Sequence, residues 1–313
     1  MRLCSAGFSL GNSTNMTTSI GIDIGGTKIS IGVLDDQSFT SKKVIATPKD
    51  GWRSVLNRVI EEVQAVEEGQ PRAQQVGIGM PGMFNPERTE VVYASNVYGF
   101  QNVPLVEYVS EALGRVVVLE NDANAAALAE DTFGAAKNAS SSVFLTISTG
   151  IGSSIILNGR IWRGVHGIAG EIGHIVADPE GALAPSGVAG ALEGIASGTA
   201  IARDASYALG HPVSTSEAFA LAQEGNELME RVVHRAMRYL GMALANVQKL
   251  IDPEVFVIGG GVASSGPYFL EHVHAYAQQF ARGFCDIKVV PAQFGTDAGA
   301  LGAAIAAQQS QSH

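Results

Sequence analysis

Cysteine is scarce in this sequence of 313 residues: Cys4 and Cys285 are the only two, and they lie far apart. A disulfide framework or a cysteine-based metal cluster needs several cysteines at short spacings, so neither is predicted. Long apolar runs are also missing, since no segment approaches the roughly 18 residues that span a bilayer. Residues 1–18 are polar and lack the apolar core of a signal peptide, so we expect a disordered tail on a cytoplasmic protein, with Met16 as a possible start.

Positive charge is sparse as well, because the chain carries a net charge of −10 and no block of Lys and Arg. A nucleic-acid-binding face needs a basic stripe to neutralise phosphates, so no nucleic-acid partner is expected. Apolar residues make up 46% of the chain, which favours a folded protein over a disordered one, and the length suits about two domains. The 37 glycines gather at the ends of strand-like segments, a pattern typical of nucleotide-binding α/β proteins.

Two segments, 19–34 and 143–158, share one design of a strand, a glycine-containing turn and a second strand. Asp23 and Ser148 occupy equivalent places in the two copies. The repeat indicates an internal duplication that gives two lobes facing each other. Hydrophobic spacing also predicts helices at about 51–68, 104–113, 191–209, 225–250 and 297–308, and strands at 75–80, 115–119 and 255–258.

The turn of the first hairpin combines glycines with an acidic and a basic residue. Its candidate phosphate-binding residues are Asp23, Gly25, Gly26, Thr27 and Lys28. Glycines let the backbone approach a phosphate closely, and Asp23 tolerates polyphosphate only if a cation lies between them, so it is a candidate outer-sphere Mg²⁺ partner. An ordinary glycine-rich hairpin is the alternative. The order of residues is not that of a Walker A loop.

The second hairpin and a later glycine run offer further contacts for a nucleotide. The donors of the hairpin belong to Ser148, Thr149, Gly150 and Gly152, and the glycine run is Gly259, Gly260 and Gly261. Two hairpins of this kind facing each other would clamp one polyphosphate. The glycine run has Ser264 where a dinucleotide fingerprint has its third glycine, so we interpret it as a flat shelf under an adenosine.

Reactive side chains follow the strand at 115–119. In open α/β sheets such groups lie at the carboxyl ends of strands, and phosphoryl transfer to an alcohol needs a carboxylate that accepts the proton. Asp122 suits that role, and Asn121 can bond a neighbouring hydroxyl; a helix N-cap is the alternative for both. Glu171 and His174, three residues apart, form a second polar pair that fits sugar hydroxyls or a structural role.

Together these motifs resemble the ROK family of sugar kinases and sugar-responsive repressors. The matching segments, in family order, are DIGGTK at 23–28, SNVYGF at 95–100, ENDAN at 120–124, STGIGSS at 148–154, GIAGEIGH at 167–174, LEGIASG at 192–198 and VIGGGV at 257–262. The resemblance implies a two-lobed actin-like ATPase (ribonuclease H-like) α/β fold with the active site in the interlobe cleft. The small lobe is then 19–120, with the C-terminal helix 297–313 packed back on it, and the large lobe is 121–296.

The resemblance also implies roles for individual residues. Asp122 becomes the catalytic base, and ATP and Mg²⁺ lie against the segments 23–28 and 148–152. The sugar hydroxyls are held by Asn96, Asn121, Asp122, Glu171, His174 and Glu193. The activity expected is ATP-dependent phosphorylation of the 6-hydroxyl of a hexose, glucose above all, by a homodimer.

One departure from the family pattern concerns metal. Many members bind zinc through three cysteines and the histidine of GEIGH, but here Ala184, Ser186 and Ala191 stand in place of the cysteines. A structural zinc needs about four ligands, and only His174 remains, so no zinc and no directly ligated metal is predicted. The loop that carries Glu193 is then expected to be held by packing alone.

Alternatives remain for the substrate and the function. Tyr98 and Phe100 stand in the segment where glucokinases tend to show a tryptophan, so an N-acetylmannosamine kinase or another hexose or amino-sugar kinase is open, as is polyphosphate as donor. A family repressor carries a helix-turn-helix of several tens of residues before the first hairpin, which is not expected here. A non-catalytic actin-like scaffold is disfavoured by the complete polar set around Asp122.

Overall fold

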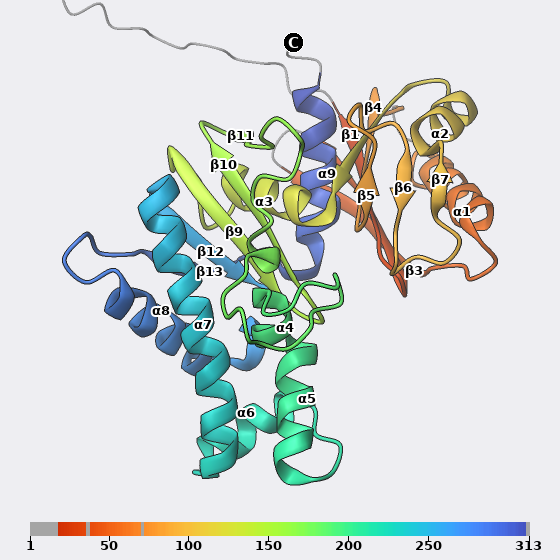
Figure 1. Cartoon of the computed structure of the whole chain (residues 1–313). Coiled ribbons are helices and arrows are strands. Elements are labelled where there is room, and N and C mark those ends of the chain that lie inside the picture. The colour runs from red at the N-terminus through yellow and green to blue at the C-terminus, as the bar shows by residue number, and fades with distance from the viewer. Residues whose placement is uncertain (1–17, 36–37, 70–71, 311–313) are drawn as a thin grey trace, which may run out of the picture.

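The computed structural model describes residues 18–35, 38–69 and 72–310, which form two five-stranded sheets with helices on both faces of each (Figure 1). The mixed α/β class predicted from the sequence is confirmed. The predicted tail, residues 1–18, lies outside the described residues except for Thr18. None of the described helices is both long and apolar enough to cross a membrane.

The first sheet has the strand order β3-β2-β1-β4-β8. Its strands are β1 (Ser19–Ile24), β2 (Lys28–Asp35), β3 (Ser38–Ala46), β4 (Gln75–Met80) and β8 (Val116–Asn121). The first three pair antiparallel, whereas β4 runs parallel to β1 and β8 runs parallel to β4. Helices α1 (Trp52–Val66) and α2 (Leu105–Leu113) cover one face, since their apolar residues recur at helical spacing.

The second sheet, of order β11-β10-β9-β12-β13, repeats this plan. Its strands are β9 (Ser141–Ile147), β10 (Ile151–Leu157), β11 (Arg160–Ile161), β12 (Val255–Gly259) and β13 (Val289–Pro291). β9 and β10 form an antiparallel hairpin, and β12 runs parallel to β9 as β4 does to β1. Helices α7 (Glu227–Ile251) and α8 (Pro267–Phe280) cover one face. The repeat noticed in the sequence thus corresponds to a repeat in topology.

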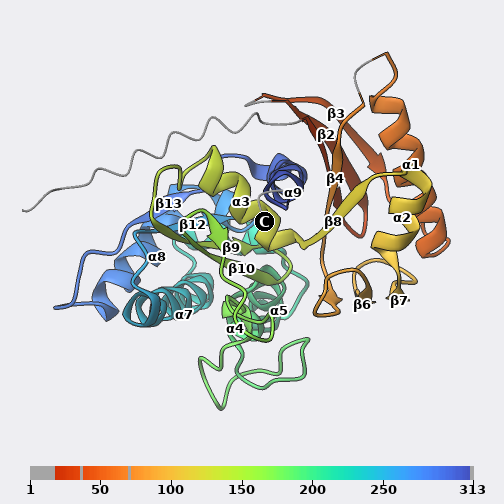
Figure 2. The same cartoon turned by 90° about the horizontal axis from the view of Figure 1, so that it is seen from above.

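The last described helix, α9 (Ala298–Gln309), lies between the first sheet and α3 (Asp122–Thr132) (Figure 2). Along β1, Ile20 and Ile22 face α1 and α2, while Ser19 and Gly21 face α9, as the period of two in a strand requires. Gly21 and Gly77 are register partners on β1 and β4. A Cβ at either would lie 1.8 Å from a carbonyl oxygen of α9, so these glycines permit the close approach of the helix.

Several elements differ from the sequence prediction. The helix expected over 191–209 is two helices, α4 (Leu192–Ala196) and α5 (Gly198–Leu209). The chain breaks there because Ser197 is extended and its hydroxyl caps α5 by accepting the Ala200 N–H at 3.2 Å. Helix α6 (Thr215–Gln223) and a small sheet of β5 (Met83–Phe84), β6 (Val91–Tyr93) and β7 (Gln101–Val103) lie where no element was predicted.

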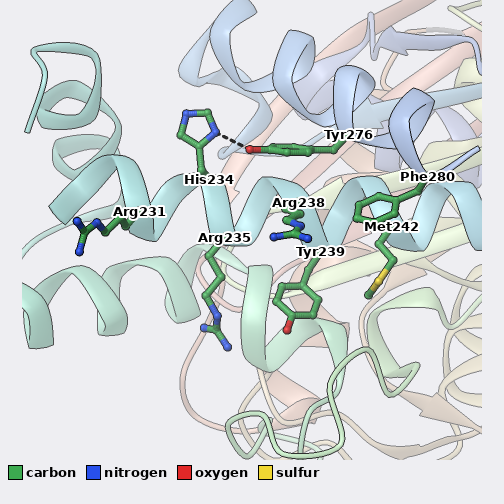
Figure 3. Close-up of a pocket in the computed structure, with 8 residues that line it drawn as sticks. All are labelled: Arg231, His234, Arg235, Arg238, Tyr239, Met242, Tyr276 and Phe280. Carbon is green, nitrogen blue, oxygen red and sulfur yellow. Dashed lines mark hydrogen bonds between the residues drawn. The ribbon is translucent and has the colours of Figure 1, made fainter. Parts of the chain in front are cut away.

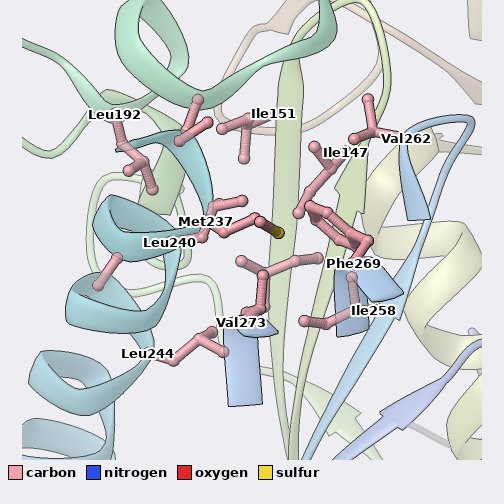
Figure 4. Packing of buried hydrophobic residues seen from close by; sticks show 14 of the residues in the cluster. Ile147, Ile151, Leu192, Met237, Leu240, Leu244, Ile258, Val262, Phe269 and Val273 are labelled. Carbon is pink, nitrogen blue, oxygen red and sulfur yellow. The ribbon is translucent and has the colours of Figure 1, made fainter. Parts of the chain in front are cut away.

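The hydrophobic core beneath the second sheet supports the turn of its hairpin (Figure 4). Ile147 and Ile151 flank the turn, and both are buried against residues of α7 and α8 such as Met237 and Phe269. Phe269 makes an edge-to-face contact with Phe219, with ring centroids 5.9 Å apart. The turn that carries the predicted phosphate donors is therefore anchored at both ends in rigid packing.

Candidate functional site

Asp122 is the first residue of α3 and directly follows β8. The N-cap is Asn121, whose Oδ1 accepts the N–H groups of Ala123 at 2.9 Å and Asn124 at 3.2 Å. Asn121 is therefore the helix N-cap, as the alternative interpretation of the sequence had it. Its side-chain nitrogen makes no hydrogen bond to the described part of the chain. Asp122 accepts the Ala123 N–H at 2.9 Å through one carboxylate oxygen. No other residue of the described chain donates a hydrogen bond to this carboxylate.

The pKa values of two further carboxylates, Asp23 and Glu171, are raised in part by the charge of Asp122. Burial and then the charge of Asp122 raise the pKa of Asp23 to about 7, although Lys28 opposes the rise. Burial, followed by the charges of Asp122 and Glu193, raises the pKa of Glu171 against the opposing effect of His174. Burial also raises the pKa of Asp122 itself. Asp23 and Glu171 are therefore both close enough to Asp122 to respond to its charge, and a raised pKa suits a group that must accept a proton near neutral pH.

The turn of the first hairpin is fixed by short-range contacts. Gly25 donates its N–H to the Lys28 carbonyl at 2.9 Å, and the Thr47 hydroxyl donates to the Gly25 carbonyl at 2.7 Å. A Cβ at Gly26 would lie 2.1 Å from the Asn96 carbonyl oxygen, so the turn packs directly on the segment that carries Asn96. Thr27 and Lys28 are exposed. The turn thus has a defined shape while its outward groups remain accessible.

The second turn meets three other segments. Ile151 donates its N–H to Glu193 Oε2 at 3.0 Å, and a Cβ at Gly150 would lie 2.5 Å from the same oxygen. Gly198, at the start of α5, donates its N–H to the Ser148 carbonyl at 2.7 Å. A Cβ at Gly261 would lie 3.7 Å from the Ser148 hydroxyl. The predicted nucleotide residues of 148–152 and 259–261 therefore lie together, next to the predicted sugar residue Glu193.

Glu171 directly precedes the short 3₁₀ segment Ile172–His174, and His174 is its last residue. Their Oε2 and Nε2 atoms are 3.7 Å apart, and about half of each side chain is exposed. The Ser153 hydroxyl of β10 fixes this segment, because it donates to the Gly170 carbonyl and accepts the Ile172 N–H at 3.0 Å. Both polar side chains are therefore accessible from a rigid support.

Sequence reasoning missed an ionic cluster around Glu120, which is 1% exposed. Its Oε2 pairs with Arg163 and lies 3.6 Å from Arg88 Nη1. Its Oε1 accepts the Asn121 N–H at 3.0 Å and the Asn124 side-chain N–H at 2.9 Å. The cluster links the β5–β6 connection, the strand end at Asp122 and the loop that leads to Glu171. A buried carboxylate signals that a cation must pair with it, but the sequence does not say which one.

The expectation that packing alone holds the loop before Glu193 is wrong. Backbone bridges join Val176 to Ala191 and Leu183 to Ala189. The Leu192 N–H donates to the Ile175 carbonyl at 2.9 Å, and Glu193 itself accepts the Ile151 N–H. The loop supplies its own hydrogen bonds because it folds back as an irregular hairpin. Among residues 18–35, 38–69 and 72–310, no three His, Cys, Asp or Glu side chains are grouped so that they could hold a metal ion.

Asp23 should make the stability of the ligand-free protein depend on pH. Its pKa is raised from 3.8 to about 7, so the folded state holds the proton more tightly than the unfolded state. The protonated carboxyl therefore adds to the free energy of unfolding in full below pH 3.8, and this addition is lost as the pH rises through about 7. We expect the Tm of Asp23→Asn to fall less than that of wild type between about pH 5 and about pH 8. Thermal unfolding at both pH values tests this; parallel decreases in the two proteins would contradict it.

Comparisons with known proteins identify one family. The model of the ROK family matches residues 19–310. A glucokinase of Thermotoga maritima is 33% identical over 305 residues, which cover 91% of this chain and 95% of the relative. A crystal structure of a ROK hexokinase from Thermus thermophilus is 41% identical with a TM-score of 0.89, covering 94% of this chain and 99% of that one. A ROK family glucokinase from Streptomyces griseus, in complex with glucose and AMPPNP, is 32% identical with a TM-score of 0.78, covering 93% and 99%.

Proposed function

The chain belongs to the ROK family, and on that basis we propose that it is an ATP-dependent hexose kinase that phosphorylates the 6-hydroxyl of a hexose, with glucose preferred. The observation that carries the proposal is the position of Asp122. Asp122 begins α3 at the end of β8, and its charge raises the pKa of Asp23 on the first hairpin and of Glu171 in the predicted sugar site, so it is close to both. A base that takes a proton from a sugar hydroxyl while phosphate arrives from the hairpins needs that position.

In the proposed reaction the 6-hydroxyl oxygen attacks the γ-phosphorus of ATP, its proton passes to Asp122, and ADP leaves. The turns 23–28 and 148–152 hold the phosphates, and the glycines 259–261 lie beneath the adenosine. Asn96, Asn121, Glu171, His174 and Glu193 hold the sugar hydroxyls. The active site lies in a cleft between two lobes, whose closure excludes water and so suppresses ATP hydrolysis.

The position of Asp23 suits the binding of the Mg²⁺ that such a reaction uses. Its carboxylate is half-buried beside Asp122, and mutual repulsion contributes to its raised pKa of about 7. A divalent cation bound through water between Asp23 and the phosphates would favour the charged carboxylate and neutralise the charge that develops during transfer. The family relationship also leads us to propose a homodimer in the cytoplasm.

The acceptor preference is the prediction that tests the proposed function. Phe100 is 2% exposed and belongs to the core of the first sheet, so of the two unusual aromatic residues only Tyr98 is available to a ligand. Because the relatives include glucokinases, we expect glucose to give the highest kcat/KM in a coupled assay of ADP release. The panel includes mannose, fructose, N-acetylglucosamine and N-acetylmannosamine. A higher kcat/KM for N-acetylmannosamine would make that sugar the preferred substrate in place of glucose. If no sugar in the panel led to ADP release, the proposed kinase activity would be rejected.

A further inference from the structure

An open groove of about 570 Å³ lies along α7 and α8, apart from the hairpin turns (Figure 3). Its lining includes Arg235, Tyr239 and Tyr276. His234 points toward the hydroxyl of Tyr276 on α8, whereas Arg235 and Tyr239 point to the other side of α7. These two side chains reach the loop that precedes Glu193, as their contacts show.

Asp178 is the residue of that loop which Arg235 and Tyr239 contact. The Tyr239 hydroxyl donates to Asp178 Oδ2 at 2.9 Å, and Arg235 Nη2 lies 4.0 Å from the same oxygen. The hydrogen bond to Asp178 is the main cause that raises the pKa of Tyr239. The Asp178 backbone in turn meets Gly190, which accepts the Asp178 N–H at 3.2 Å. A Cβ at Gly190 would lie 1.5 Å from the Asp178 carbonyl, so the two segments are in close contact three residues before Glu193.

A second chain of contacts runs from Arg235 to the other side of Glu193. Arg235 Nη1 donates to Asp204 Oδ2 at 3.1 Å, and Arg203 Nε donates to Asp204 Oδ1 at 2.8 Å. Arg203 then donates through Nη2 to the Gly194 carbonyl at 3.0 Å. Gly194 directly follows Glu193 in α4. Arg235 thus pairs with two carboxylates, one linked to each side of Glu193.

We propose that Arg235 is a positioning residue for Glu193. Without its guanidinium, Asp178 and Asp204 lack the cation that they share, and the segments on the two sides of the five-residue helix α4 are no longer tied to each other through α7. The Glu193 carboxylate is itself held by the Ile151 N–H, so its orientation depends on how precisely the segments around α4 are placed. The inference rests on the proposed function, because it takes Glu193 as a ligand of the sugar. Arg235 does not touch the sugar, so its loss weakens sugar binding without removing a reacting group.

We expect Arg235→Ala to raise the KM for the sugar about fivefold, with kcat changed less than about twofold, as loss of two partly exposed ion pairs implies. Arg235→Lys should recover part of the affinity, and Tyr239→Phe should raise KM about twofold. Arg238→Ala is the matched control, since Arg238 lies one turn further along α7 and forms no ion pair with the described residues. Tyr276→Phe is the control for Tyr239, because its hydroxyl bonds His234 instead.

Two further readouts separate positioning from general destabilisation. Higher salt screens exposed ion pairs, so it should raise the KM of wild type and leave that of Arg235→Ala unchanged. Hydrogen exchange at residues 177–194 should be faster in Arg235→Ala and unchanged elsewhere. If Glu193→Ala raises KM while Arg235→Ala behaves as Arg238→Ala, the inference fails and the proposed function stands. If Glu193→Ala leaves KM unchanged, the proposed sugar site fails and the inference falls with it.

Discussion

Replacing Asp122 with Asn is expected to lower kcat by about 10³-fold, the size typical of losing a general base. The amide keeps the shape of the side chain and the contact with the Ala123 N–H requires only an oxygen, so the start of α3 should be preserved. Sugar affinity, measured by calorimetry without ATP, should change by less than about threefold because the other sugar residues remain. Release of ADP in a coupled assay measures the loss of turnover.

Asp131→Asn provides the matched control for this prediction. Asp131 lies on the same helix and burial raises its pKa to about 6, but its partner is Ser142 of β9 and not a hairpin turn. We expect the turnover of this variant to stay near that of wild type. An Asp122→Asn enzyme with turnover within tenfold of wild type would remove Asp122 as the base. It would leave the assignment of the hairpins untouched.

Replacing Gly21 with Ala is expected to lower the Tm by roughly 10 °C, which corresponds to about 3 kcal/mol of overpacking. The new Cβ would lie 1.8 Å from the Ala300 carbonyl oxygen and 2.8 Å from the Ala304 nitrogen. Both are backbone atoms of α9, so no side-chain rotation relieves the contact, and the helix must move off β1. Thermal unfolding followed by circular dichroism measures the shift.

Gly79→Ala is the control for Gly21, since Gly79 lies on the neighbouring strand β4 near the same helix. A Cβ there would meet the Ala125 Cβ at 3.4 Å, which is an ordinary contact distance. Its Tm should therefore stay within about 3 °C of wild type. Equal Tm values for the two variants would show that α9 can shift away from β1 at little cost, and that the packing between them is not rigid.

The parts of the fold with clear periodicity were predictable from the sequence. The helix expected at 51–68 is α1, and the strand expected at 75–80 is β4, because both have regular apolar spacing. The strands β5, β6 and β7 are two or three residues long, which is too short for a period to show. The break between α4 and α5 combines the Ser197 cap with the hydrogen bond from the Gly198 N–H to the Ser148 carbonyl, and local spacing does not reveal that long-range contact.

The candidate site shows the same division. Residues such as Asp122 and Glu171 were found because short motifs carry them, and the structure places them close together. The pairing of Glu120 with Arg163 and of Arg235 with Asp178 was not found. Each joins residues more than forty positions apart through side chains on different elements. Which cation meets which carboxylate is decided by the tertiary fold, so spacing along the chain carries no signal for it.

The position of α9 has a consequence for how the protein is made. This helix is synthesised after every strand that it covers, yet it fills the space between the first sheet and α3. A growing chain on the ribosome therefore holds β1, β4 and α3 without the partner that buries their small-residue faces. Its sheets can form early, but they acquire their native arrangement only after residues 298–309 emerge. Until then the nascent chain exposes these surfaces to chaperones and proteases. A chain that ends before α9 because of a premature stop codon exposes them permanently.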